Sequence, residues 1–346
     1  MRIGVVGAGV AGALLAWRLR QASRRTEVDV YAAAPPVTDA TGASGGLVRG
    51  FEPAADAARL AADSLAELRA DPALCAAAAY REIGSVYLLP PAADPAGPVR
   101  VVDELLPGSA AVLTGAELRS RYPFRDLPAG ATAVAERCAG YLSPAGLRAA
   151  ALARLASGGA TIRPTPVAGI GRAPRLLLAD GVTAGYDAVV VAAGAWTPAL
   201  LAASGLADGG LRTRQIQYAV YRAGPARFGA FVDDLTGLYG RPDGDRLLLL
   251  GLPSDRWDVD PAGVRPDPGL VERVADLARR RLGDPPAGGR PIRTVASCDC
   301  YHDPPGLVLR PAVCGAPVFT FTGGSGGAAK TVLAASRAAA AALLGR

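Results

Sequence analysis

The fold is decided near the start of the chain by the stretch Ile3-Gly4-Val5-Val6-Gly7-Ala8-Gly9-Val10-Ala11-Gly12. An apolar run typical of a buried strand leads into three glycines spaced GxGxxG, and an amphipathic segment from Ala13 to about Gln21 follows. In that setting the first glycine makes a tight turn, the second lets the backbone approach a pyrophosphate, and the third allows the helix to pack closely on the strand. The start of the helix offers unpaired N–H groups and a partial positive charge. The stretch therefore predicts a dinucleotide site formed by Gly7, Gly9, Val10, Ala11 and Gly12.

The strand expected next, Val28 to Tyr31, ends without the acidic residue that usually binds a ribose hydroxyl in this motif. Ala32 stands at that position. Either another group, such as Asp39, holds the ribose, or this hydrogen bond is absent. In the second case the affinity must come from other contacts, and a covalent link is one of them.

Length and composition limit the classes of protein. At 346 residues the chain exceeds the usual size of one core, so two lobes are expected, and an apolar content of 50% argues against disorder. The net charge of +6 comes from scattered basic residues, which does not favour a nucleic-acid partner. The longest apolar runs are too short to span a bilayer, so no membrane partner is expected. Because the first strand begins at Arg2, there is no room for a signal peptide, and a cytoplasmic location is expected.

The cysteines indicate neither disulfides nor a metal site. In a cytosolic chain the odd, sparse set Cys75, Cys138, Cys298, Cys300 and Cys314 is typical of free thiols. Cys298 and Cys300 lack a second pair of ligands at zinc spacing. No metal is expected.

Four further segments resemble the glycine oxidase and sarcosine oxidase branch of the D-amino-acid oxidase family. They are the segments Thr41–Arg49, Gly140–Leu147, Asp187–Pro198 and Val318–Lys330. The most specific is the third, in which an apolar strand runs into Ala-Gly-Ala-Trp-Thr-Pro. Together with the opening glycines they touch nearly the whole chain. The resemblance implies FAD as the cofactor.

The resemblance also implies which further residues contact FAD. Small side chains in the loop and in the closing glycine turn would let a flavin ring lie against backbone, and the last helix would point its positive end at the pyrimidine carbonyl. The alternatives are a mobile surface loop and a simple start of a helix. The implied contacts are Ser44, Gly45, Gly46, Val167, Ala193, Gly194, Trp196, Gly324, Ser325, Gly326, Gly327 and Ala328.

Candidate catalytic residues follow from the same resemblance for Lys330 and Arg49, and from residue type for Glu52 and His302. Lys330 is the only lysine among 37 basic residues and matches the family position that meets a substrate carboxylate, although a solvated helix lysine is the alternative. Arg49 is a second contact and would place positive charge near the flavin. Glu52 either recognises a cationic group, acts as a base, or only leads into a helix over Asp56–Arg69. His302, the only histidine, is either a general base or an exposed residue at a strand end.

At one position the residue allows more than one interpretation within the family pattern, and at another the residue differs from that pattern. Cys298 falls where related enzymes tether the flavin through sulfur, but a buried, inert thiol is the favoured reading, and an alignment slip of two would exchange it with Cys300. Leu249 stands nearest to the position of a lysine that activates oxygen in sarcosine-oxidase-like enzymes. Slow oxygen use, another electron acceptor and a relocated cation all remain open.

The expected fold class is α/β, with a Rossmann-type FAD lobe interleaved with an α+β substrate lobe built on an antiparallel sheet. The expected FAD lobe comprises residues 1–80, 136–208 and 296–346, and the substrate lobe 81–135 and 209–295, with Pro/Gly-rich breaks at 90–98 and 285–291. The expected reaction is hydride transfer from a carbon bearing nitrogen in a small amine or amino acid, with oxygen or another acceptor taking the electrons. Oxidation of a hydroxy acid or alcohol, a flavin monooxygenase and a degenerate flavoprotein are the alternatives.

Overall fold

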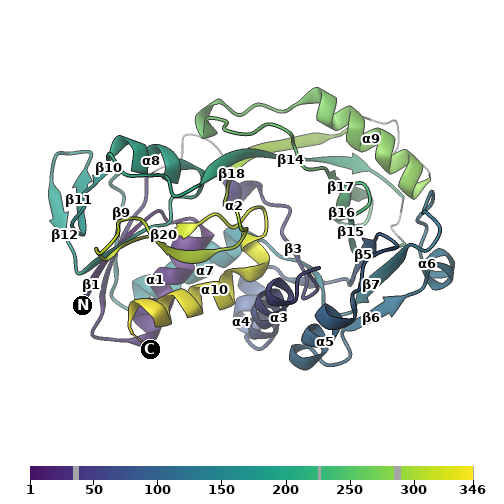
Figure 1. Ribbon diagram of the computed structural model, residues 1–346, viewed down its shortest axis with the longest axis horizontal. Coiled ribbons are helices and arrows are strands. Elements are labelled where there is room, and N and C mark those ends of the chain that lie inside the picture. Colours follow the sequence, from purple (N-terminus) through teal and green to yellow (C-terminus); the bar gives the residue numbers. More distant parts are fainter. Residues whose placement is uncertain (34–38, 225–226, 284–289, 346) are drawn as a thin grey trace.

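The computed structural model of the chain describes residues 1–33, 39–224, 227–283 and 290–345. Two large sheets lie toward opposite ends of an elongated molecule, and both termini lie at the end that carries the first of them (Figure 1). That sheet consists, in order, of β19 (Val308–Pro311), β20 (Val318–Thr322), β13 (Ala188–Val191), β1 (Arg2–Val6), β2 (Glu27–Tyr31) and β9 (Thr161–Arg163). All its neighbours are parallel except β19 and β20. The central strands β1 and β13 are continuous apolar runs because both of their faces are buried.

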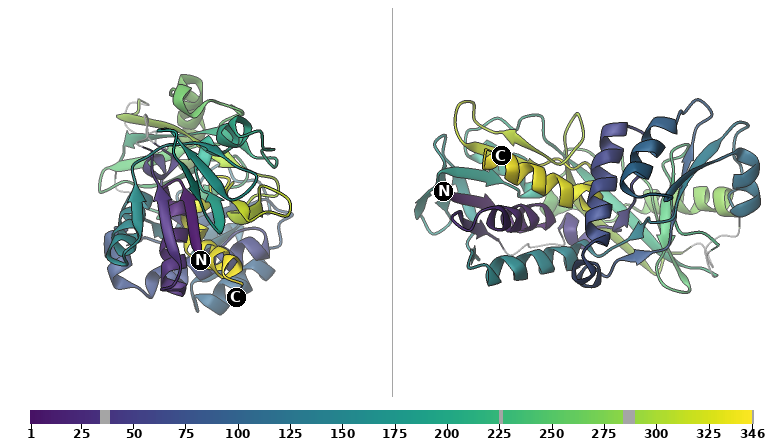
Figure 2. Two further views of the ribbon diagram at one scale, coloured as in Figure 1. Left: turned by 90° about the vertical axis from the view of Figure 1, so that its left-hand side faces the viewer. Right: turned by 90° about the horizontal axis from the view of Figure 1, so that it is seen from below.

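Helices cover one face of the six-stranded sheet. The first helix, α1 (Val10–Ala22), lies between α7 (Pro144–Ser157) and α10 (Ala328–Leu343), and Figure 2 shows α1 and α10 side by side. The start of α7 is fixed by Ser143, whose Oγ accepts the N–H of Gly146 at 3.0 Å, and by a proline in the first turn. Two further helices, α3 (Ala55–Arg69) and α4 (Pro72–Ala77), extend this layer.

The other face of the sheet carries a small antiparallel sheet and a short helix. Its strands are β10 (Val167–Ile170), β11 (Arg175–Leu178) and β12 (Thr183–Gly185). A turn of 3-10 helix (Gly194–Trp196) leads from β13 into α8 (Thr197–Ala203). Alternate residues of β13 separate the two cores: Val190 packs under α1, whereas Val189 packs under the small sheet.

The second large sheet has eight strands. They are, in order, β18 (Arg293–Tyr301), β14 (Arg212–Arg222), β17 (Leu247–Gly251), β16 (Tyr239–Pro242), β15 (Ala230–Asp233), β5 (Ser85–Leu89), β7 (Thr132–Glu136) and β6 (Ala110–Leu113). Only β15 and β5 are parallel among these pairs. Buried Tyr221 and Phe231 belong to the core beneath α9 (Pro268–Leu282), and α5 (Ala96–Leu105) and α6 (Gly115–Arg121) lie near β6 and β7. Tyr218 and Tyr239 face the opposite way, toward a cavity.

The remaining elements join the two lobes. A three-stranded sheet is formed by β3 (Leu47–Val48), β8 (Gly140–Tyr141) and β4 (Arg81–Glu82), and the short helices are α2 (Ala40–Ala43) and a 3-10 turn at Pro261–Gly263. Most of the break expected at 285–291 lies outside the described residues. None of the helices in the described part of the chain has the length and apolar character that crossing a membrane requires.

The expected α/β class with a parallel sheet under helices and a second, mainly antiparallel sheet is confirmed. The exact lobe boundaries stay a prediction. β18 crosses the boundary expected at residue 296, because all nine of its residues pair with β14 in the eight-stranded sheet.

Candidate functional site

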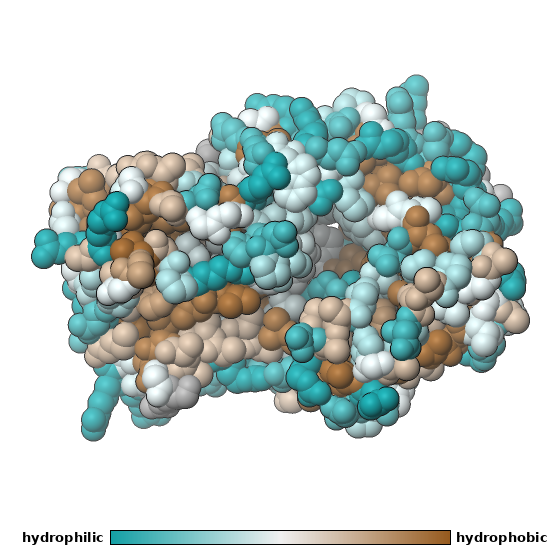
Figure 3. Space-filling model, viewed as in Figure 1, coloured by the Kyte–Doolittle hydropathy of each residue, from teal (hydrophilic) through white to brown (hydrophobic). Residues whose placement is uncertain are grey.

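A cavity of about 1110 Å³ lies between the two large sheets, and Figure 3 shows the surface hollowed near the middle of the view. Its walls come from the turn after β1, the segment around α2 and β3, the turn before α10, and residues of β14 and β18. Typical ligand pockets measure about 300–1,000 Å³. The cavity therefore has room for a dinucleotide and a small second molecule.

The first glycine turn is shaped by close backbone contacts. Gly7 has a φ of 106°, and a Cβ atom there would lie 2.5 Å from the carbonyl oxygen of Ala192. A Cβ on Gly12 would lie 2.0 Å from the carbonyl oxygen of Gly7. These two positions require glycine, and the turn brings the start of α1 to the cavity wall.

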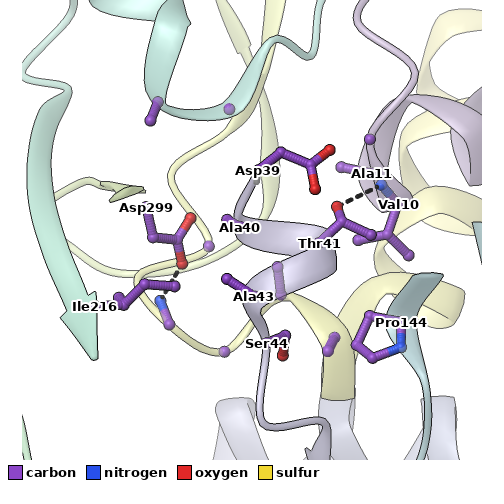
Figure 4. Close-up of a pocket in the computed structure, with 18 of the residues that line it drawn as sticks. Val10, Ala11, Asp39, Ala40, Thr41, Ala43, Ser44, Pro144, Ile216 and Asp299 are labelled. Carbon is purple, nitrogen blue, oxygen red and sulfur yellow. Dashed lines mark hydrogen bonds between the residues drawn. The ribbon is translucent and has the colours of Figure 1, made fainter. Parts of the chain in front are cut away.

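The start of α1 is partly capped by the neighbouring segment. The N–H of Val10 donates to Thr41 Oγ1 at 3.1 Å, as Figure 4 shows, and Gly9 supplies no side-chain cap. The first turn of α1 holds no acidic residue, so the partial positive charge of this helix end is not neutralised from within the helix. Ala11 lines the cavity, so its N–H group, which has no partner within the helix, is placed to meet a phosphate.

An apolar residue stands where the motif usually places the ribose-binding acid. Ala32 lines the cavity directly after β2, and Tyr31, Val167 and Trp196 also belong to the wall. Asp39 also lies in the wall near Val10 and Ala11 (Figure 4). Its carboxylate is already engaged: Oδ1 accepts the N–H of Gly42 at 2.7 Å, which caps α2, and Oδ2 pairs with Arg148 at 2.8 Å. A role for Asp39 on the ribose remains a proposal.

The loop of small residues, Ser44 to Gly46, accepts a hydrogen bond from an arginine outside the cavity wall. Ser44, Gly45 and Gly46 line the cavity, and a Cβ on Gly46, whose φ is 68°, would lie 1.9 Å from the carbonyl oxygen of Leu142. The Nε of Arg241 donates to the carbonyl oxygen of Gly45 at 2.8 Å.

Arg241 is also the cation beside the position of the missing lysine. It is the register partner of fully buried Leu249, and its guanidinium lies 4.0 Å from the ring centroid of Tyr141. It pairs with Asp243 at 2.8 Å, and neither Arg241 nor Leu249 is part of the cavity wall.

The closing glycine turn faces the same cavity. Gly324, Ser325, Gly326, Gly327 and Ala328 all line it, and the first turn of α10 holds no acidic residue. The N–H of Gly326 donates to Oδ2 of Asp299 on β18 at 3.0 Å, a contact drawn in Figure 4. Burial raises the pKa of Asp299, against the lowering by its hydrogen bonds from Cys300 and Gly326. Sequence reasoning missed this carboxylate.

Arg49, Glu52 and Lys330 meet in one corner, which we call the Glu52 corner. Glu52 Oε1 lies 2.8 Å from a terminal nitrogen of Arg49 and 2.5 Å from Nζ of Lys330. Arg49 and Lys330 line the cavity, and Glu52 lies outside its wall. Arg49 also donates through Nε to the carbonyl oxygen of Phe51 at 3.0 Å, and its guanidinium lies 5.0 Å from the ring centroid of Tyr87.

A second glutamate fixes the backbone of this corner. Glu136, at the end of β7 and only 3% exposed, accepts the N–H of Phe51 at 2.6 Å through Oε1 and that of Gly50 at 2.8 Å through Oε2. No sequence motif marks Glu136. In the sequence it is recognisable only as a charged residue at the end of a mostly apolar strand.

Burial and neighbouring charges shift the pKa of Glu52 in opposite directions. Burial alone would raise the pKa of Glu52, but Arg49 and Lys330 outweigh it, so the pKa is lowered. Burial lowers the pKa of Lys330, and the charge of Arg49 adds to this, against Glu52. Burial raises the pKa of Glu136 despite its backbone hydrogen bonds. Glu52 is therefore the ionised partner of both cations.

Cys298 is not placed where a tether to a ligand in the cavity would need it. Side chains alternate along a strand, and Asp299 and Tyr301 line the cavity. Cys298 is not in the wall, and its Sγ lies 3.9 Å from the carbonyl oxygen of Val259. Burial, together with the charge of Asp299, raises the pKa of its thiol to about 12. Cys300 lies in the core beneath the small sheet.

His302 also lies outside the cavity wall. Its Nδ1 lies 2.9 Å from the carbonyl oxygen of Pro304, and its Nε2 lies 3.1 Å from that of Gly209. The structure thus gives the ring two backbone partners and no contact with the cavity. A general-base role would require His302 to leave both of them.

Aromatic and cationic residues of β14 and β18 complete the wall on the side of the eight-stranded sheet. The guanidinium of Arg214 lies 4.5 Å from the ring centroid of Trp257 and 5.4 Å from that of Tyr301. Its Nε donates to the carbonyl oxygen of Ser254 at 2.7 Å. Sequence reasoning also missed these residues, because no motif marks them.

The residues present fit an FAD molecule. The glycine turn before α1 borders the cavity through Gly7, Gly9 and Ala11, and the glycine turn before α10 borders the same cavity. The two helix ends are positive and free of acidic side chains in their first turns. Among the described residues no group of His, Cys, Asp and Glu is placed to hold a metal ion.

Comparison with known proteins identifies the family. The structure is similar to L-proline dehydrogenase from P. horikoshii (TM-score 0.80, 16% identity, 98% of this chain and 92% of that chain). It is also similar to glycine oxidase from Geobacillus kaustophilus (TM-score 0.76, 20% identity, 100% and 95%) and to iminodiacetate oxidase from Chelativorans sp. (TM-score 0.73, 20% identity, 100% and 96%). A search of curated proteins finds no match. Residues 2–342 match the DAO family of FAD dependent oxidoreductases, and the chain belongs to that family.

Proposed function

We propose that this FAD-dependent oxidoreductase oxidises a carbon–nitrogen bond of a small amine or amino acid. The similar structures are named for glycine, proline and iminodiacetate, each of which carries such a bond. Those names support the class of reaction. The substrate of this chain has to be inferred from the residues of its own cavity.

Neighbouring aromatic and apolar residues in the cavity wall carry the proposal. Tyr218 and Tyr239 both pair with Gly251 in the sheet, and they line the cavity together with Leu252. Burial raises the pKa of Tyr239, which means that the surroundings disfavour a charged form. The same surroundings favour a neutral amine over an ammonium ion. An amine gives up a hydride only when its nitrogen lone pair is free, so such a pocket prepares it for oxidation.

When bound, FAD supplies the acceptor for the hydride. The proposed contacts are those of the two glycine turns and the small-residue loop, with the phosphates beside the N–H group of Ala11 at the start of α1. The wall of β14 and β16 would hold the amine against the cofactor and exclude water. The resulting imine would hydrolyse after release. Arg49, Glu52 and Lys330 are proposed as the charged group nearest to the substrate, and oxygen or another acceptor would take the electrons.

A spectroscopic experiment tests this function. The purified protein is expected to be yellow, and its flavin absorbance is expected to bleach when an amine is added without oxygen. Matched pairs such as glycine with glycolate, and methylamine with methanol, separate amines from hydroxy compounds. Bleaching by the hydroxy compound alone would replace the proposal by alcohol oxidation. A yellow protein that no amine in a broad panel bleaches would contradict it.

A further inference from the structure

We infer that Glu52 is an internal counter-ion of the two cations that line one corner of the cavity, and that the substrate is an amine without a carboxylate next to its reacting carbon. This inference rests on the proposed oxidation of a carbon–nitrogen bond and narrows its substrate class. It assigns to Glu52 the role of a specificity-determining residue.

Both cavity-lining cations of the corner bind one oxygen atom. Nζ of Lys330 and a terminal nitrogen of Arg49 lie 2.5 and 2.8 Å from Oε1 of Glu52. A substrate carboxylate in the cavity would have to compete with Glu52 for these two cations. Ion pairs with so little exposure are screened only weakly by salt and water, so the internal pair is hard to displace.

Glu52 already offsets part of the positive charge of the corner. Arg49 and Lys330 contribute two positive charges. Glu52 contributes one negative charge, and Glu136, whose two oxygens both accept backbone N–H groups, is bound as a second carboxylate. The side chains of Arg49, Glu52 and Lys330 are only 11%, 14% and 16% exposed. A further carboxylate would lose its hydration to enter a corner whose cations Glu52 already neutralises in part.

The chain also gives Glu52 an advantage over any dissolved carboxylate. Glu52 follows Arg49 by three residues, and Glu136 holds the intervening Gly50 and Phe51 through their N–H groups. A tethered group acts at a high effective concentration and gives up little freedom on binding. Arg148, another cation of the cavity wall, is likewise paired with an acid, Asp39.

Binding of acetate and acetamide to the FAD-loaded protein tests the inference without turnover. Each is titrated while the flavin absorbance is followed. In the natural protein the two are expected to bind with similar, weak affinity. In Glu52→Gln acetate is expected to bind about tenfold more tightly, a gain of about 1.4 kcal/mol, with acetamide unchanged. Glu104→Gln, an exposed glutamate on α5, serves as the control and is expected to behave like the natural protein.

A second variant keeps the inference testable if Glu52→Gln does not fold. Lys330→Met is expected to leave the weak binding of acetate to the protein unchanged, because Glu52 already satisfies Lys330. Tight acetate binding by the natural protein that is lost in Lys330→Met would overturn the inference. Acetate binding that Glu52→Gln leaves unchanged or weakens would do the same. The titration measures no turnover. A protein that bound acetate and acetamide as expected but oxidised no amine would therefore contradict only the proposed function.

Discussion

The carbonyl oxygen of Gly7 occupies the space in which a side chain on Gly12 would begin, since a Cβ there would lie 2.0 Å from it. Gly12→Ala is therefore expected to push the turn away from α1, at about 1–3 kcal/mol of unfolding free energy. The N–H groups that should meet the phosphates would move with it. We expect a lower Tm and purified protein with little or no FAD, measured from the ratio of flavin to protein absorbance.

Gly97→Ala is the matched control for this variant. Gly97 lies in α5, and a Cβ there would have no atom within 4 Å. Alanine is the better helix former, so the Tm should stay the same or rise slightly. A Gly12→Ala protein with normal FAD content and the Tm of this control would show that the turn does not depend on Gly12.

The parts of the site that sequence predicts are those in which neighbouring residues carry the chemistry. The glycine spacing around Gly9, the start of α1 after it, and the pairing of a first and a last glycine turn follow from local backbone requirements. The absence of an acidic residue at the position of Ala32 is also evident from the sequence, because the motif fixes that position relative to the glycines. The family resemblance supplied Arg49 and Lys330 as candidates, and the fold places both in one corner.

The rest depends on which face of a strand a residue occupies and on partners distant in the chain. A shift of one residue decides whether Cys298 or Asp299 faces the cavity, and composition cannot fix that register. With Tyr301 placed in the wall, alternation would have indicated Asp299. Glu136 holds Phe51 across 85 residues of sequence, so only the folded chain brings them together.

Cys298→Ser is expected to leave the attachment of FAD unchanged. The thiol lies outside the cavity wall, and a pKa raised to about 12 by burial keeps it protonated, so it is a poor nucleophile. Acid precipitation of the natural protein and of the variant should release all yellow colour into the supernatant. A covalent tether through Cys298 would be established if the pellet of the natural protein stayed yellow and the pellet of Cys298→Ser did not.

Glu136→Gln is expected to lower the unfolding free energy by about 1–3 kcal/mol, because an amide cannot accept both the Gly50 and Phe51 N–H groups with its two polar atoms. Burial raises the pKa of Glu136 above its ordinary 4.5. Between these two pKa values the folded protein binds more protons than the unfolded chain, so the natural protein loses stability as pH rises. Glutamine does not titrate.

The difference in unfolding free energy between the natural protein and Glu136→Gln should therefore be largest near pH 4.5 and shrink as pH rises. Urea unfolding at a series of pH values measures it. A difference that grows with pH would mean that the folded state lowers the pKa of Glu136.

Arg241→Met is expected to weaken FAD binding by about tenfold or more. The variant loses the hydrogen bond to the carbonyl oxygen of Gly45, about 1.5–3 kcal/mol for a charged donor, and the contact with the Tyr141 ring. The loop of Ser44, Gly45 and Gly46 would then be free to shift at the cavity wall. Arg222→Met, at the exposed end of β14, removes the same charge from a residue outside the cavity wall and should retain FAD. Equal FAD affinity in both variants, measured by fluorescence titration of the FAD-free proteins, would show that Arg241 does not position the loop.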